Sequence, residues 1–148
     1  MSWQVKRLVD SARLPSRAHG SDLCHDIYVV SDDCFIGGSY ELAPGERKVF
    51  RTGIKFRLPF GHSFILKDRS GNAVKKGLTV LAGVIDSNYT GEILVCLLNT
   101  SKDRWEISEG DRIAQGYIQR NESFEPEEVD ELIEETDRGS AGFGSTGS

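Results

Sequence analysis

The sequence predicts an all-β fold, an antiparallel barrel or sandwich of the jelly-roll kind, with a flexible C-terminal arm. Between residues 27 and 119 the chain consists of short runs rich in β-branched and aromatic residues. Gly, Pro, Asn or Asp closes each run, which is the pattern of strands joined by turns. Glycine makes up 16 of the 148 residues, about 11% against ~7% in average proteins, and this excess fits a chain with many turns.

Eight strands follow from this pattern. They cover residues 27–30, 47–50, 53–58, 62–66, 78–81, 92–99, 104–107 and 112–118. Turn signals lie between them, for example at Pro44-Gly45 and Glu109-Gly110. A chain of this length favours a single domain, and surface scaling allows about 68% of its surface to be buried.

The C-terminal region differs in composition from the strands. Residues 122–137 hold nine Asp or Glu and no Lys or Arg, and residues 138–148 are rich in Gly and Ser. We therefore expect a β-barrel domain over residues 1–121, an acidic tether over 122–137 and a mobile arm over 138–148. Residues 126–135 show helical spacing of apolar residues, so a helix is the alternative to the charged, partly extended linker that we expect there.

The cysteines and the N-terminal sequence indicate the cellular compartment in which the protein works. Cys24, Cys34 and Cys96 form no C-x-x-C pair and are odd in number, which argues against a disulfide framework and a structural zinc site. The N-terminus lacks the apolar stretch of a signal peptide, and no run is long enough to cross a membrane. We expect a cytoplasmic protein with neither membrane nor nucleic acid as a partner.

Two internal segments combine polar side chains with turns. Residues 83–92, GVIDSNYTGE, follow an apolar run and precede another, so we expect a β-hairpin with Asp86 near its tip. A carboxylate that leaves a buried strand is held firmly, although an Asx-turn is an equal alternative for Asp86. Arg69, Ser70 and Gly71 form a polar turn that could cradle an anion, and Gln115 is a long amide within a strand-like run.

The tail offers a second anion-binding possibility. Residues 142–147 match G-x-G-x-x-G, but a dinucleotide site needs a strand before this motif and a helix after it. What remains is a flexible backbone that, with Arg138, Ser145 and Thr146, could wrap phosphates, and Phe143 could stack on a base. A tail that stays disordered is the alternative. Histidine-based metal sites, the G-x-S-x-G elbow and the P-loop have no matching motif.

The order of these segments resembles the trimeric deoxyuridine triphosphatases (dUTPases) from Gly20 to Gly147. Five motifs follow the family's order. Gly20-Ser21-Asp22-Leu23, with residues 44–54, resembles the first motif, and Arg69-Ser70-Gly71 resembles the second. GVIDSNYTGE resembles the third, GDRIAQ over residues 110–115 the fourth, and RGSAGFGSTG over residues 138–147 the fifth.

This resemblance implies a distorted jelly-roll barrel of the β-clip type that forms a homotrimer with active sites shared between subunits. It implies hydrolysis of dUTP to dUMP and pyrophosphate with Mg²⁺ held by the triphosphate, which keeps uracil out of DNA and supplies dUMP for dTMP synthesis. Asp86 would activate the attacking water. Asp22 would touch the metal through water only.

The remaining implied roles concern substrate binding. Tyr89 would lie under the deoxyribose, and Phe143 would cover the uracil ring. The residues expected to bind substrate are Arg69, Ser70, Gly71, Gly83, Val84, Ile85, Tyr89, Gln115, Arg138, Phe143, Gly144, Ser145 and Thr146.

Some residues depart from the family pattern. Lys67-Asp68 stands where the family usually has Ala-Pro, and Arg51 stands where Asp or Pro is common. Two alternatives remain open on the same fold, a non-catalytic nucleotide-sensing or partner-binding module and a dCTP deaminase relative. The second needs a catalytic glutamate in a third motif of a different pattern.

The net charge of −5 is an average over two unlike regions. Without residues 122–137, the chain holds 18 Lys and Arg against 14 Asp and Glu, a formal charge of +4. A basic body suits a triphosphate ligand.

Overall fold

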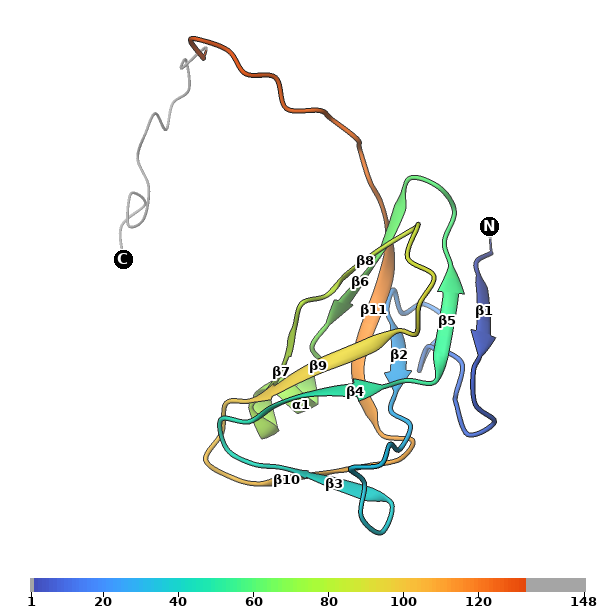
Figure 1. Cartoon of the computed structure of the whole chain (residues 1–148), viewed down its shortest axis with the longest axis vertical. Helices are drawn as coiled ribbons and strands as arrows, with labels where there is room; N and C mark the ends of the chain where they lie inside the picture. The colour runs from blue at the N-terminus through green and yellow to red at the C-terminus, as the bar shows by residue number, and fades with distance from the viewer. Residues whose placement is uncertain (1, 133–148) are drawn as a thin grey trace.

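The computed structural model describes residues 2–132 and shows a nearly all-β protein (Figure 1). The predicted fold class is confirmed. All eight predicted strands are present, with bounds that differ by a few residues. The elements are β1 (Gln4–Arg7), β2 (His25–Tyr28), β3 (Ser39–Leu42), β4 (Arg47–Arg51), β5 (Ile54–Arg57), β6 (His62–Lys67), α1 (Ser70–Lys76), β7 (Leu78–Leu81), β8 (Val84–Asp86), β9 (Leu94–Asn99), β10 (Trp105–Ser108) and β11 (Arg112–Arg120).

The strands form four separate antiparallel sheets instead of one closed barrel. The largest has the order β2-β11-β6-β8, and a three-stranded sheet has the order β4-β9-β7. Two further pairs, β1 with β5 and β3 with β10, lie at the side and at the lower end of the molecule (Figure 1). The core between the sheets includes Phe50, Phe64 and Leu97, each at most 1% exposed.

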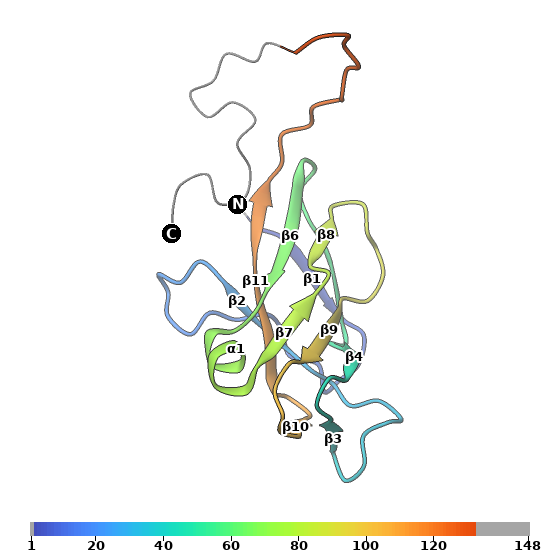
Figure 2. The same cartoon turned by 90° about the vertical axis from the view of Figure 1, so that its left-hand side faces the viewer.

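The helix of the structure lies where the sequence suggested a turn. Residues 126–132 carry no helix, which agrees with the expected linker, and the helical alternative for residues 126–135 is wrong for the part that the structure describes. The one helix of residues 2–132 is α1, which starts within the expected Arg69-Ser70-Gly71 turn and lies beside β7 (Figure 2). Gly77 ends it in the left-handed region, with φ 65°, where glycine is favoured. Within residues 2–132, no helix has the length and apolar character needed to cross a bilayer.

The hairpin expected over residues 83–92 is absent from the structure. β8, at the start of this segment, pairs with β6, whereas β9, which follows it, pairs with β4 and β7, so the two strands belong to different sheets. Nor does Asp86 leave a buried strand, because Val84 and Asp86 are both exposed in the isolated chain. A turn closed by the Tyr89 N–H donating to the Asp86 carbonyl at 3.1 Å connects the two sheets.

A tyrosine–carboxylate pair joins β3 to the start of β4. The Tyr40 hydroxyl donates to Glu46, which also accepts the Ala43 N–H at 2.7 Å. The hydrogen bond from Tyr40 lowers the pKa of Glu46, and the same bond, together with burial, raises the pKa of Tyr40 to about 12. The stability that comes from neutral Tyr40 is therefore lost only as the pH rises through about 12.

Glu46→Gln should reduce the sensitivity of the fold to acid. Because the folded-state pKa of Glu46 is lowered, its ionised form stabilises the fold above its ordinary pKa of 4.5, and this contribution is lost as the pH falls. We expect the urea denaturation midpoint of the wild type to fall more between pH 7 and pH 3 than that of Glu46→Gln. Glu41→Gln is the control, since Glu41 makes only an exposed ion pair with Arg104. Equal declines in all three proteins would contradict the assignment.

Candidate active site on the outer face of the main sheet

The register of β11 places three polar side chains side by side. Gln115 pairs with Asp26 of β2 on one side and with Lys67 of β6 on the other. Residues that are directly paired across antiparallel strands project from the same face of the sheet. This is the outer face, because Phe64 and Leu66, which alternate with Ile65 and Lys67 along β6, are buried in the core.

Asp26 is the centre of this polar group. The residue is 8% exposed, and its carboxylate accepts from Arg69 Nε at 2.8 Å and from Arg112 Nη1 at 3.4 Å. Two arginines from distant parts of the sequence therefore converge on one carboxylate. A buried carboxylate needs this compensation, and the geometry fixes both guanidinium groups beside Gln115.

The second motif is held by contacts with β11. Gln115 Nε2 donates to the Asp68 carbonyl at 2.8 Å, immediately before Arg69. Ser70 and Gly71 follow as the first residues of α1 and are exposed. The structure thus brings Arg69, Ser70, Gly71 and Gln115 together, as predicted. We call these four residues and Asp26 the arginine half-site.

Asp86 lies at the other end of the same sheet face. It pairs with Ser63 of β6, four residues from Lys67, and a rise of about 3.3 Å per residue puts about 13 Å between these positions along the strand. Between them runs one apolar row, formed by Val84, Ile65 and Tyr117 in mutual register. The outer face therefore has a polar group at each end and an apolar row across its middle.

β8 forms the free edge beside Asp86. It is the last strand of its sheet and pairs only with β6. The Gly83 carbonyl accepts from the Leu66 N–H at 2.7 Å, so the alternation of an antiparallel ladder directs the N–H and C=O groups of Val84 away from β6. Of Gly83, Val84 and Ile85, only Val84 thus turns its backbone N–H and C=O to the free edge, whereas those of Gly83 and Ile85 face β6. We call these three residues, Asp86 and Tyr89 the β8 half-site.

Tyr89 is fixed by the close approach of Gly91. Its hydroxyl donates to the Glu92 carbonyl at 2.9 Å, and a Cβ at Gly91 would lie 2.4 Å from that hydroxyl. A side chain at position 91 would displace the ring. The ring itself is 44% exposed.

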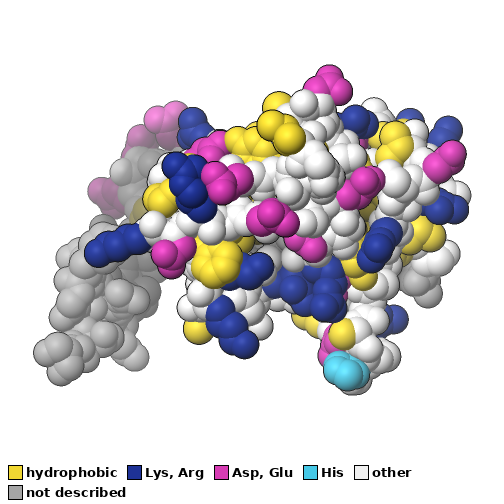
Figure 3. Space-filling view, turned by 90° about the horizontal axis from the view of Figure 1, so that it is seen from below, with side chains coloured by type: hydrophobic (Ala, Val, Ile, Leu, Met, Phe, Trp, Pro, Cys, Tyr) yellow, Lys and Arg dark blue, Asp and Glu magenta, His cyan; other side chains and the backbone are white. Residues whose placement is uncertain are grey.

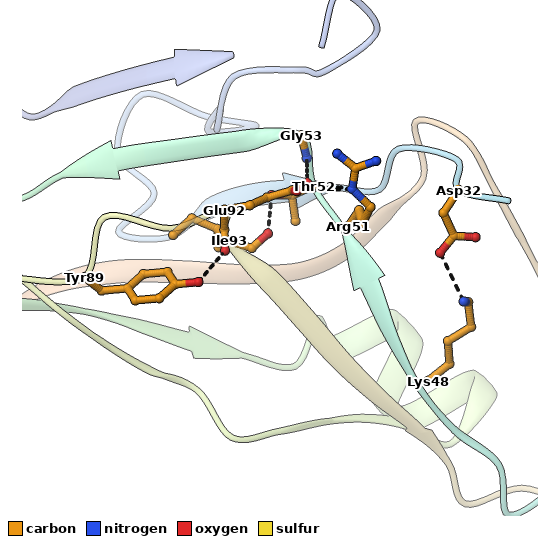
Figure 4. A network of polar contacts seen from close by, with 8 residues as sticks. All are labelled: Asp32, Lys48, Arg51, Thr52, Gly53, Tyr89, Glu92 and Ile93. Carbon is orange, nitrogen blue, oxygen red and sulfur yellow. Dashed lines mark hydrogen bonds and ion pairs between the residues drawn. The ribbon is translucent and has the colours of Figure 1, made fainter. Parts of the chain in front are cut away.

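Glu92 anchors the segment that carries Asp86 and Tyr89 (Figure 4). Its carboxylate accepts from Arg51 Nε at 3.1 Å and from the Gly53 N–H at 2.8 Å. The carbonyl of the next residue, Ile93, accepts from the hydroxyl of Thr52, which lies between β4 and β5. This accounts for the departure at Arg51, whose guanidinium is the counter-ion of Glu92.

Asp22 and Asp26 differ in their surroundings. Asp22 Oδ2 accepts the His19 N–H at 2.9 Å within an exposed turn, and among residues 2–132 no hydrogen bond or ion pair joins Asp22 to Arg69 or Gln115. Asp26 was not predicted. A signal was present, since an acidic residue directly precedes the predicted strand at residues 27–30, but its arginine partners are distant in the sequence.

Arg138, Phe143, Gly144, Ser145 and Thr146 lie outside the described residues. Within residues 2–132, no group of three or more His, Cys, Asp or Glu side chains could hold a metal ion. All three cysteines are free. Burial, with Asp22 and Asp26 nearby, raises the pKa of the Cys24 thiol, which disfavours the nucleophilic thiolate.

Basic and acidic side chains are interspersed over the face seen in Figure 3, without a single-sign field. The positive charge of the site therefore comes from side chains close to it and not from a field that covers a whole face. Arg69 and Arg112, with Lys76 and Asp111, line a small cavity of about 180 Å³ next to the arginine half-site.

Comparison with known proteins identifies the family. The model of the dUTPase family matches residues 10–147. The chain belongs to the dUTPase family. It is 41% identical to the deoxyuridine 5'-triphosphate nucleotidohydrolase of Corynebacterium glutamicum, over 97% of this chain and 93% of that protein. It is 44% identical to the Thermobifida fusca protein of that name, over 97% of this chain and 78% of that protein.

Solved dUTPase structures share the fold. The dUTPase of Staphylococcus bacteriophage 80alpha with dUPNHPP matches with a TM-score of 0.83 and 28% identity, over 99% of both chains. A mutant dUTPase of phage phi11 of S. aureus, in which a structural Mg(II) ion is coordinated, matches with a TM-score of 0.78 and 25% identity, over 89% of this chain and 99% of that chain. The predictions of the dUTPase family and of a hydrolase of this class are confirmed.

Glu92→Ala should destabilise the protein by about 1–3 kcal/mol, because the Gly53 N–H and the Arg51 guanidinium lose a partly buried acceptor. The measurement is urea denaturation at pH 7. Glu41→Ala is the matched control, since the exposed pair of Glu41 with Arg104 should contribute less than about 1 kcal/mol. Equal losses in the two variants would refute the anchoring role of Glu92.

Proposed function

We propose that this protein hydrolyses dUTP to dUMP and pyrophosphate at a site that combines the arginine half-site of one subunit with the β8 half-site of a neighbouring subunit. The observation that carries the proposal is the presence of both half-sites on one sheet face, in a chain of the dUTPase family. One offers cations and an amide for phosphates. The other offers a carboxylate, an aromatic ring and a free strand edge for a nucleoside.

Asp86 is the proposed general base. In the reaction, a water oxygen attacks the α-phosphorus, the bond to the bridging oxygen of the β-phosphate breaks, and pyrophosphate leaves. Asp86 accepts the proton of the attacking water, a role worth about 10² to 10⁴ in rate. The turn closed by the Tyr89 N–H and the Asp86 carbonyl, with the Glu92 anchor behind it, fixes the direction of this carboxylate.

The strand edge is the proposed reader of the base. Uracil offers an N3–H donor between two carbonyl acceptors, and the outward N–H and C=O groups of Val84 can complement this pattern. Cytosine would place a donor against a backbone donor, and unpaired buried polar groups give strong discrimination. Tyr89 would pack under the deoxyribose and leave no room for a 2'-hydroxyl.

The arginine half-site is proposed to bind the phosphates through Arg69, Ser70, Gly71 and Gln115. Mg²⁺ bound by the triphosphate would neutralise part of its charge. The donor set fits a metal brought by the substrate, because carboxylates here are sparse and cations are close. Asp26 lies nearer to this group than Asp22 does, so we propose Asp26 as the carboxylate that faces the metal's water shell.

A second copy of this chain is the proposed cover of the apolar row. Val84 is 68% exposed in the isolated chain, and Ile65 and Tyr117 are half-buried beside it. The two half-sites flank this row and lie about 13 Å apart along β6. A neighbouring subunit that covers the row can set its own half-site opposite, and we propose a homotrimer with three such shared sites.

The acidic tether and the arm complete the proposal. We propose a β-barrel domain over residues 1–121, an acidic tether over residues 122–137 and an arm over residues 138–148. The arm residues that would close over the bound nucleotide are Arg138, Phe143, Gly144, Ser145 and Thr146. Three free cysteines support a reducing, cytoplasmic location. There the reaction would keep uracil out of DNA and supply dUMP for dTMP synthesis.

Pyrophosphate release from dUTP, dCTP, dTTP and UTP with Mg²⁺ tests the function. We expect a strong preference for dUTP and a rate for Asp86→Asn at least about 100-fold lower, with dUTP binding retained. Asp33→Asn, an exposed aspartate distant from the site in sequence, should keep the wild-type rate. Binding without turnover in the wild type would favour the nucleotide-sensing module, and release of ammonia from dCTP would favour the deaminase relative.

Mixed oligomers test the sharing of sites. Asp86→Asn and Arg69→Ala subunits should each be nearly inactive alone. After joint refolding, some sites receive an intact half-site from each subunit, and we expect a substantial fraction of the activity to return. Two Asp86→Asn preparations refolded together are the control. Mixtures that stay inactive while forming hetero-oligomers would place each site within a single chain.

A further inference from the structure

Asp68 is a carboxylate that the proposed mechanism does not use. It lies between the last residue of β6 and Arg69. Its Oδ1 accepts the Val80 N–H at 2.5 Å, and its Oδ2 accepts the Thr79 hydroxyl at 3.0 Å. Both donors belong to β7, an edge strand of the β4-β9-β7 sheet. The carboxylate therefore takes the hydrogen-bonding place that a neighbouring strand would occupy.

The backbone of the same residue reaches the arginine half-site. The Asp68 carbonyl accepts from Gln115 Nε2 at 2.8 Å, and the next residue, Arg69, donates to Asp26 at 2.8 Å. The Arg69 carbonyl in turn accepts the Ala73 N–H at 2.9 Å, which starts α1. Asp68 thus connects β7 through its side chain with β11 through its carbonyl.

We propose that Asp68 is a positioning residue for phosphate binding, an inference that rests on the proposed function. The dUTPase family usually has proline at this position, and a proline ring fixes φ covalently. Here two hydrogen bonds from β7 supply the restraint that the ring would give. This explains how an acidic residue can precede Arg69 without repelling a triphosphate, because its oxygens face β7 donors instead of the arginine half-site.

We expect loss of the Asp68 carboxylate to weaken binding of the phosphates and to have little effect on binding of the nucleoside. Without the carboxylate, the segment 68–71 is no longer held to β7, and its position relative to the Gln115 amide becomes less well defined. Small misplacements of binding groups are costly. Asp68→Ala should weaken binding of dUpNHpp with Mg²⁺ by about 10-fold and binding of dUMP by less than about 2-fold. Asp68→Asn keeps an oxygen acceptor for the Val80 N–H and should recover most of the difference.

Calorimetric titration of the full-length protein with dUpNHpp and with dUMP is the decisive measurement. Glu46→Ala is the matched control, since Glu46 also accepts a backbone N–H and a hydroxyl but belongs to the β3–β4 connection. It should lower the denaturation midpoint and leave the ratio of the two affinities unchanged. An Asp68→Ala protein that behaves in the same way would show that Asp68 is merely structural.

Hydrogen exchange separates this inference from the proposed function. In Asp68→Ala the Val80 and Ala73 amides should exchange about 10-fold faster, while the Ile93 amide, bonded to the Ile54 carbonyl, should be unaffected. Unchanged exchange at Val80 and Ala73 would overturn the positioning role. A wild type that fails to bind dUpNHpp would instead overturn the proposed function.

Discussion

Backbone pairing along β11 aligns Gln115 with Asp26 on one side and with Lys67 on the other, and the arginine half-site follows from this register. A slip by one residue would turn Gln115 into the core and bring Ala114 or Gly116 to the outer face. The buried pairing of Asp26 with two arginines would then be lost, and a buried carboxylate without a partner is costly. The pairing of β11 is thus a condition for the stability of the sheet and for the binding of phosphates at once.

The β8 half-site depends on different contacts. Glu92 fixes its segment to the β4–β5 corner through Arg51 and the Gly53 N–H, on a part of the molecule that shares no strand with β2 or β11. Loss of the Glu92 contacts should therefore leave the hydrogen bonds of Arg69, Gln115 and Asp26 in place, although both half-sites lie on one sheet. In a shared site this independence means that each subunit needs to fold only its own two half-sites, and that assembly alone sets them opposite each other.

Most of the fold, and about half of the site, could be predicted from the sequence. Strands such as β9 and β11 are rich in apolar residues and have clear turn signals beside them. β1 and β3 were missed because they are largely polar, and β8 because it lies within the segment expected to be a hairpin. The helix α1 was missed because Ser70, Gly71 and Asn72 are typical of turns, and its stability comes from β7 and the Gly77 end. Asp86, Gln115 and Arg69 could be proposed as site residues because their motifs are local. Asp26 and the role of Asp68 were not, since both depend on partners far along the chain.

The short length of β8 has a consequence for solubility. A strand that reads a base through its backbone must keep one edge unpaired, and such an edge is also a template for association with strands of other molecules. Three residues, bounded by the Leu66–Gly83 bond at one end and the Asp86 turn at the other, offer few groups to an incoming strand. The negative charge of Asp86 opposes extension of any such pairing. The same carboxylate that would activate water therefore also protects the open edge from aggregation before a ligand arrives.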